Sequence, residues 1–395
     1  MAEREQRVER GFEAVRDAFV AAHPAEVGGA QLCVYRHGRP VLDLWTGRDT
    51  AADRPYGPET LTVLMSCTKG AVAILAQQML ARGELSLDAP IAEAWPEFAA
   101  NGKGAITLAH VLTHSSGLFG WDADAGLGGA TALDWEAATS ALSEMESYWA
   151  PGTAYLYHFI TYGFLVGEVV RRITGKTLGQ HLAERISGPL GLDLWIGLPE
   201  AEQGRVAEHV RAAPAVSPEA LNATFAAMGV DPGDRLIRGL VATMGATDAL
   251  IDLMTTPAGR AAEVPAGNGV GDARSLARMY AATFGEVDGV RLLTTDGVEA
   301  LRTPRTDHLK APAPFPPAPD GEAQRFALGV ELPRRLIPLL GDGSYGHPGA
   351  GGRLAFAHPE SGCAVGYACN GMLWDGRNPD PRWAWLPVLA DAVRG

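Results

Sequence analysis

Ser66 and Lys69 stand three residues apart in an otherwise mostly apolar stretch of sequence. In a helix, residues at this spacing share one face with their β-carbons roughly 5–6 Å apart, so the lysine amine can reach the serine hydroxyl. A serine hydroxyl is a weak nucleophile until a neighbouring base takes its proton. Lysine supplies that base only where burial or another cation favours its neutral form. The pair therefore predicts a serine nucleophile, and its apolar neighbours predict a buried helix.

Two further segments matter, because a serine and a lysine three apart occur by chance in most chains of this length. One is the aromatic run Tyr155 to Phe159, which precedes an apolar helix expected over 162–170. Within this run, Tyr157 is either a proton shuttle or a packed core side chain. The other segment is Gly346 to Gly352, where glycines let a backbone approach a ligand closely or simply form a hairpin loop.

The order and spacing of these three segments resemble the serine β-lactamase and penicillin-binding-protein superfamily, in particular its class C-like esterase or acyltransferase branch. Shorter stretches match in type and order along most of the chain: 83–90, 112–118, 169–175 and 188–192. The resemblance implies an α/β (α+β) fold, an antiparallel sheet flanked by helices with an inserted, mostly helical lobe. Residues 1–89 and 266–395 would form the sheet domain and 90–265 the lobe, with the active site between the two.

The resemblance also implies roles for the residues that fall on the superfamily's motifs. Ser66 is the acyl-accepting nucleophile, and Lys69 is the amine that helps to take its proton. Tyr157 is the general base of acylation, with its pKa pulled down by Lys69, and it hands the proton to the leaving group. The backbone N–H groups of Ser66 and Ala350 form the oxyanion hole, where each donor is worth roughly 3–4 kcal/mol to the transition state.

Two departures from the superfamily's pattern concern the substrate. Phe159 replaces the asparagine of Tyr-x-Asn, an amide that holds the side-chain carbonyl of a β-lactam. His347, with Gly349 two residues later, replaces the lysine of Lys-Thr-Gly and is a weaker, pH-dependent anchor for a carboxylate. Both changes favour esters over β-lactams. His158 is either a structural hydrogen-bonding residue or a substrate contact, and the sequence favours neither.

The sequence thus predicts a cofactor-free serine hydrolase that works through an acyl-Ser66 intermediate, with a carboxylesterase acting on small esters favoured. A transacylase that passes the acyl group to a small-molecule alcohol or amine needs the same residues. A β-lactamase or D-aminopeptidase fits the departures less well. A non-catalytic binding domain would not need Ser66, Lys69 and Tyr157 together. The chain contains no Gly-x-Ser-x-Gly elbow, His-Glu-x-x-His zinc helix or phosphate-binding loop.

Composition is that of an ordinary globular chain, 47% hydrophobic and 20% charged over 395 residues. The net charge of −13 argues against nucleic acid or an anionic membrane as partner. The cysteines, Cys33, Cys67, Cys363 and Cys369, show neither metal-ligand spacing nor disulfide density, so no metal is expected. The charged start, Met1 to Arg7, is unlike a secretory signal, and no apolar run reaches the length of a membrane span. Cytoplasmic residence is therefore expected.

Hydrophobic periodicity predicts the helices and strands around these residues. Besides the nucleophile helix it predicts helices over 8–22, 178–186, 236–255 and 385–393, and strands over 31–36, 41–45, 325–332, 353–357 and 363–369. Six prolines in the segment 303–322 exclude helix and central strand. That segment either borders the acyl pocket or is a plain connector. The glycine-rich stretch 120–130 is a candidate second rim, and 267–271 a turn before a helix that starts near Ala273.

Overall fold

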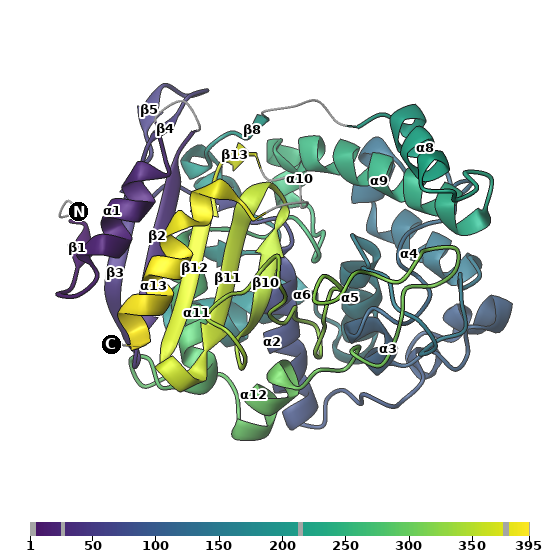
Figure 1. Cartoon of the computed structure of the whole chain (residues 1–395). Coiled ribbons are helices and arrows are strands. Elements are labelled where there is room, and N and C mark those ends of the chain that lie inside the picture. Colours follow the sequence, from purple (N-terminus) through teal and green to yellow (C-terminus); the bar gives the residue numbers. More distant parts are fainter. Residues whose placement is uncertain (1–4, 25–27, 212–215, 374–378, 395) are drawn as a thin grey trace.

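Strands from the two ends of the chain form one antiparallel sheet, on the left of Figure 1. In the residues that this computed structural model describes, 5–24, 28–211, 216–373 and 379–394, the sheet has the order β1-β3-β2-β12-β11-β10. Its strands are β1 (Arg7–Val8), β2 (Ala30–Arg36), β3 (Arg39–Thr46), β10 (Tyr345–Gly349), β11 (Arg353–His358) and β12 (Cys363–Cys369). In the middle of the sheet β12 pairs with β2, and Val365 lies opposite Val34. The prediction that N- and C-terminal strands share one antiparallel sheet is confirmed.

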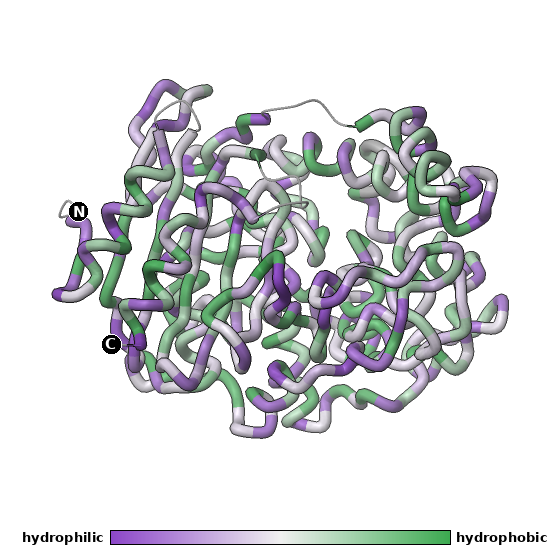
Figure 2. The backbone as a smooth tube through the Cα atoms, in the orientation of Figure 1, coloured by the Kyte–Doolittle hydropathy of each residue, from purple (hydrophilic) through white to green (hydrophobic). Residues whose placement is uncertain are grey.

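The two faces of this sheet are packed differently, because alternate residues of a strand point to opposite faces. One face is covered by α1 (Glu13–Ala21) and α13 (Trp385–Arg394), which pack against large side chains such as Phe356 and Val365. The other face presents small residues, Ala355 and Ala364 among them, toward α2 (Cys67–Ala81) and α11 (Ala273–Phe284). Hydrophobic residues run along these central strands (Figure 2). The small side chains let α2 lie close to β10 and β11.

Helices are the main regular elements of the chain between α2 and α11, as predicted, and much of this part lies on the right in Figure 1. Its helices are α3 (Leu108–Leu112), α4 (Trp135–Glu144), α5 (Thr161–Thr174), α6 (Leu178–Leu182), α7 (Gly188–Leu190), α8 (Pro218–Ala227), α9 (Arg235–Met254) and α10 (Pro257–Ala261), and α12 (Thr295–Arg302) follows α11. Small sheets are formed by β6 (Thr62–Val63), β9 (Val270–Gly271) and β7 (Leu194–Trp195), by β8 (Val210–Arg211) with β13 (Gly371–Met372), and by β4 (Arg48–Asp49) with β5 (Arg54–Pro55). The domain boundaries expected at 89/90 and 265/266 stay a prediction.

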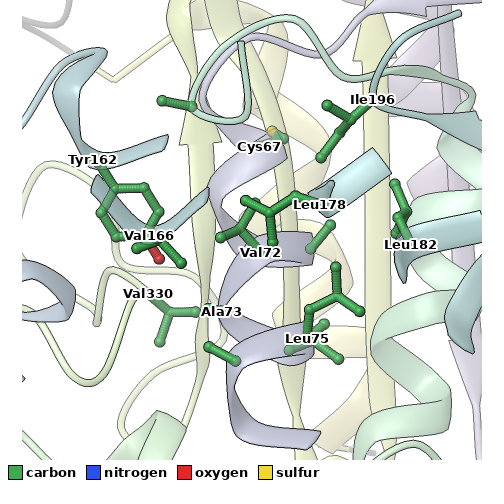
Figure 3. Close-up of a cluster of buried hydrophobic side chains, with 14 of the residues drawn as sticks. Cys67, Val72, Ala73, Leu75, Tyr162, Val166, Leu178, Leu182, Ile196 and Val330 are labelled. Atoms are coloured by element: carbon green, nitrogen blue, oxygen red, sulfur yellow. The ribbon is translucent and has the colours of Figure 1, made fainter. Parts of the chain in front are cut away.

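Helix α2 is enclosed on all sides. Every residue from Cys67 to Met79 is buried, as the apolar sequence predicted. Figure 3 shows Val72 of α2 among side chains from neighbouring helices, including Tyr162 of α5 and Leu178 of α6. A helix that is apolar all round is stable only inside a protein. The enclosed helix therefore gives the residue at its N-terminus a fixed position.

Two predicted elements are wrong. The helix expected over 8–22 begins only at Glu13, because Val8 pairs with Leu42 of β3 instead. The strand expected over 325–332 is a tight loop in which Phe326 and Glu331 pair with each other. Its apolar residues are buried because the loop packs beside β10, so alternation in the sequence reflected burial and not a strand.

The other predicted strands and helices are present with bounds shifted by a few residues. The segment Gly346 to Gly349 is strand β10 and not a hairpin loop. The proline-rich segment 303–322 contains neither helix nor strand, as expected. Of the charged start Met1 to Arg7, residues 1–4 lie outside the described residues. Within the described ranges, no helix has both the length and the apolar character that crossing a membrane requires.

Candidate active site

Ser66 immediately precedes α2 and shares one side of its first turn with Lys69. Lys69 Nζ lies 3.2 Å from Ser66 Oγ, 2.7 Å from the carbonyl oxygen of Phe159 and 2.9 Å from that of Ala266. The lysine is fully buried, and burial lowers its pKa well below the usual value because the charged form loses its hydration. The contact predicted from the spacing is thus present, and the amine is held in the state that a base requires.

The backbone before Ser66 is held in an unusual conformation. Met65 has a φ of 51°, which is uncommon for any residue except glycine. Such strain persists where the surrounding structure fixes it. Here the N–H of Leu64 donates to the Gly269 carbonyl at 2.7 Å, and the N–H of Gly269 donates to Thr68 Oγ1 at 2.9 Å. The glycine-rich stretch 267–271, expected to be only a turn, therefore supports the segment that carries Ser66.

Tyr157 lies over the Lys69 amine, with Nζ 4.8 Å from the centre of its ring. Its ring stacks on Phe326, and its hydroxyl is buried without a hydrogen-bond partner in the described part of the chain. Burial raises the pKa of Tyr157 well above the usual value, although Ser66 favours the ionised form. The expectation that Lys69 lowers this pKa is wrong, because an amine that burial keeps neutral cannot stabilise a phenolate.

His347 lies in β10 and lines the same cavity as Ser66. Its Nδ1 is 2.7 Å from the Pro348 carbonyl oxygen, which can only accept, so Nδ1 carries the proton and Nε2 is an acceptor. Nε2 is buried and has no partner among the described residues. Burial lowers the pKa of His347 to about 3. The expected pH-dependent anchor for a carboxylate is therefore wrong, because a neutral ring that presents an acceptor does not bind an anion.

His158 does not line the cavity. Its Nε2 lies 2.7 Å from Ser116 Oγ and its Nδ1 2.8 Å from the Leu156 carbonyl oxygen, while its backbone N–H donates to His114 Nδ1 at 3.1 Å. Both ring nitrogens are thus occupied inside the fold. Of the two alternatives, the structural role is correct and the substrate contact is wrong. The neighbouring Phe159 does line the cavity.

Gly349 and Ala350 also border the cavity, opposite the start of α2. A β-carbon on Gly349 would lie 2.5 Å from the Leu64 carbonyl oxygen, so only glycine allows the two segments to approach this closely. The Cys67 thiol donates to the His347 carbonyl oxygen at 3.2 Å. Burial raises the pKa of that thiol, so Cys67 is a packed, protonated side chain. These contacts hold the N-terminus of α2 against β10.

The cavity has a volume of about 540 Å³, and most of its lining is apolar. Helix α9 contributes one wall, with Leu240, Met244 and Ile251. Phe315 of the proline-rich segment contributes another, so this segment borders the pocket and is more than a connector. The stretch 120–130 is not a rim of this cavity; residues 121–128 contribute to separate hollows on the other side of α9.

Sequence reasoning missed the α9 wall and a buried ion pair in the cavity. Arg334 Nε lies 2.8 Å from Glu331 Oε1, and both side chains are less than a tenth exposed. A signal was available, since two opposite charges three residues apart follow a run of apolar residues. Within the described residues, no group of three or more His, Cys, Asp or Glu side chains is arranged to hold a metal ion.

The model of the family named Beta-lactamase matches residues 16–389 of this sequence. The chain belongs to the beta-lactamase family. Within the family, the esterase/beta-lactamase LipL of Mycobacterium tuberculosis is 33% identical over 377 residues, which cover 92% of this chain and 82% of LipL.

Two solved structures extend this similarity to the fold. EstA from Arthrobacter nitroguajacolicus Rue61a superposes with a TM-score of 0.81 at 29% identity and covers 99% of each chain. A family VIII carboxylesterase superposes with a TM-score of 0.77 at 30% identity and covers 98% of this chain and 99% of its own. The resemblance inferred from the motifs and the fold that it implied are both confirmed.

Proposed function

We propose that this member of the beta-lactamase family is a carboxylesterase that acts through an acyl-Ser66 intermediate. The observation that carries the proposal is the buried Lys69 amine, 3.2 Å from the Ser66 hydroxyl at the wall of a mostly apolar cavity. The similarity of the chain to a protein named esterase/beta-lactamase and to a family VIII carboxylesterase supports the reaction class.

The contacts of Lys69 support its role as the base. A neutral lysine has two N–H donors and one lone pair. The carbonyl oxygens of Phe159 and Ala266 only accept, so both donors are committed to them. The lone pair is then directed at Ser66, the third contact. Lys69 therefore takes the Ser66 proton while Oγ attacks the ester carbonyl.

The later steps use Ala350 and Tyr157. Attack forms the bond from Ser66 Oγ to carbon and places negative charge on the former carbonyl oxygen, which the backbone N–H groups of Ser66 and Ala350 bind. Collapse breaks the bond to the alcohol portion. The unpartnered Tyr157 hydroxyl gives its proton to the leaving alkoxide and regains one from the Lys69 ammonium. Water then attacks the acyl group with Lys69 again as base, which releases the acid and restores the Ser66 hydroxyl.

Neutral esters with apolar groups fit this cavity better than β-lactams. We expect kcat/KM for a chromogenic cephalosporin to be at least about 10²-fold lower than for p-nitrophenyl butyrate. The reason is that the cavity lacks the groups that would bind the side-chain carbonyl and the carboxylate of a β-lactam. His347 is neutral, and Phe159 offers no amide. The measurement compares both substrates on one enzyme preparation. Equal kcat/KM values would show that other groups of the cavity replace the missing anchors.

The pH dependence of kcat/KM shows whether Lys69 or His347 titrates in the acid limb. Activity requires the neutral amine, so kcat/KM should be high above the lowered pKa of Lys69 and be lost as the pH falls through it. His347, with a pKa of about 3, is neutral above about pH 5 and contributes no change there. We therefore expect the acid limb of the His347→Gln variant to keep its wild-type midpoint. A limb that shifts or disappears in this variant would assign the titration to His347.

Intact-protein mass spectrometry tests the proposed function directly. Mixed with a panel of p-nitrophenyl esters, the wild-type enzyme should gain the mass of the acyl group on Ser66 and lose it again in water. An adduct that persists until an alcohol or amine is added would replace the hydrolase with a transacylase. The absence of any adduct and of any turnover with the whole panel would contradict the proposal.

A further inference from the structure

Arg353, at the start of β11, is a fully buried cation behind the cavity. Its Nη1 donates to the Ala350 carbonyl oxygen at 2.9 Å, and its Nε donates to the Val63 carbonyl oxygen at 3.2 Å. Its remaining contacts in the described part of the chain are His209 Nε2 at 3.1 Å and the Met372 sulfur at 2.8 Å. Burial keeps His209 neutral by lowering its pKa well below the usual value. None of these four partners is anionic.

Such an arrangement is costly for packing alone. A buried charge is unfavourable unless it is well paired, and arginine does not lose its proton inside proteins. An apolar side chain of similar volume would avoid this cost. What the guanidinium gains is a set of hydrogen bonds to two backbone carbonyls. The position of those two carbonyls therefore indicates what Arg353 does in the fold.

The two carbonyls belong to the two segments that meet at the nucleophile. Val63 lies in β6, three residues before Ser66, and Ala350 directly follows β10. These strands belong to different sheets, so no backbone ladder fixes one relative to the other. Arg353 bonds to both. Gly351 makes this possible, because a β-carbon there would lie 2.4 Å from Arg353 Nη1.

We propose that Arg353 positions the oxyanion hole by fixing Ala350 relative to Ser66. The two backbone N–H groups are then aligned for the tetrahedral oxyanion before a substrate binds, and the nearby positive charge favours that anion. Arg353 does not line the cavity and touches no reacting atom, so it is a positioning residue. The inference rests on the proposed acyl-Ser66 mechanism and adds a residue that the reaction scheme above does not use.

The test compares Arg353→Met and Arg353→Lys with the wild type. An alkyl boronic acid adds to a serine nucleophile and mimics the tetrahedral state, so its inhibition constant reports on the oxyanion hole. We expect Arg353→Met to lower kcat for p-nitrophenyl butyrate by about 10²-fold, with little change in KM. Boronate affinity should fall by a similar factor. Arg353→Lys, which keeps the charge and can reach one carbonyl, should recover part of both losses.

A matched control separates positioning from stability. Arg274 of α11 forms an ion pair with Asp43 of β3 at 2.6 Å, at the other end of the sheet from β10. Arg274→Met should lower Tm and leave kcat and boronate affinity unchanged. A folded Arg353→Met enzyme with wild-type kcat, or with reduced kcat and unchanged boronate affinity, would overturn the inference. If Arg353→Met does not fold, kcat and boronate affinity are measured on Arg353→Lys instead. Wild-type values of both in that variant would overturn the inference. Failure of the proposed function would look different, because the wild type itself would bind no boronate on Ser66.

Discussion

Replacement of Ser66 by alanine is expected to lower kcat for p-nitrophenyl butyrate by about 10⁴-fold or more and to abolish the acyl adduct. In the proposed mechanism Ser66 Oγ forms the bond to the acyl carbon, and it is the hydroxyl that contacts Lys69. The serine side chain makes no capping hydrogen bond to α2, so the variant should keep its fold. Initial rates, intact mass and Tm measured on the same preparation check all three expectations.

The control for this variant is Ser143→Ala. Ser143 lies in α4, outside the cavity, and donates to the Ser140 carbonyl oxygen at 2.7 Å. The Ser143→Ala variant should retain wild-type turnover and acylation. A Ser66→Ala enzyme that still forms an acyl adduct would place the nucleophile elsewhere.

Replacement of Lys69 by methionine should slow acylation by about 10³-fold, within the range that general bases contribute. Methionine fills similar space but has neither a basic nitrogen for the Ser66 proton nor donors for the Phe159 and Ala266 carbonyls. Lys69→Arg should be similarly slow, because arginine stays charged and cannot accept a proton. The burst of p-nitrophenol in the first turnover measures this step. A fast burst in Lys69→Arg would show that a positive charge, and not a base, is what Ser66 requires.

Lys103 provides a matched control for Lys69. It is also buried, and its amine donates to the carbonyl oxygens of Ala100, Ser143 and Met145, where it joins two helical segments. Lys103→Met should therefore lower Tm through unpaired carbonyls and leave acylation unchanged. The comparison separates loss of a buried amine as such from loss of the amine beside Ser66.

The parts of the site that depend on local geometry could be predicted from the sequence. The contact between Ser66 and Lys69 follows from helical spacing, and β2, β3, β11 and β12 follow from short apolar runs bounded by turn signals. Protonation states could not be predicted this way. Burial sets the pKa of Tyr157 and His347, and it arises from segments distant in sequence, such as the loop that carries Phe326.

The walls of the cavity were beyond prediction for a related reason. The periodicity of 236–255 predicts a helix, but it does not say which apolar face lines the cavity with Phe315 and Ser66. The buried loop at 325–332 resembled a strand because close packing against β10 requires the same apolar residues as a sheet. In both cases the missing information is the identity of the tertiary neighbour.

The pairing of β2 with β12 also determines when the enzyme can first work. During synthesis, β2 and β3 leave the ribosome long before their partner strand exists, and a lone hairpin is only marginally stable in water. Ala350, the expected second oxyanion donor, arrives almost as late as β12. A nascent chain therefore carries Ser66 and Lys69 for most of its synthesis without a complete site. Release of the C-terminal strands completes the central sheet and the site together, so a chain that stops within β12 should be inactive rather than merely weakened.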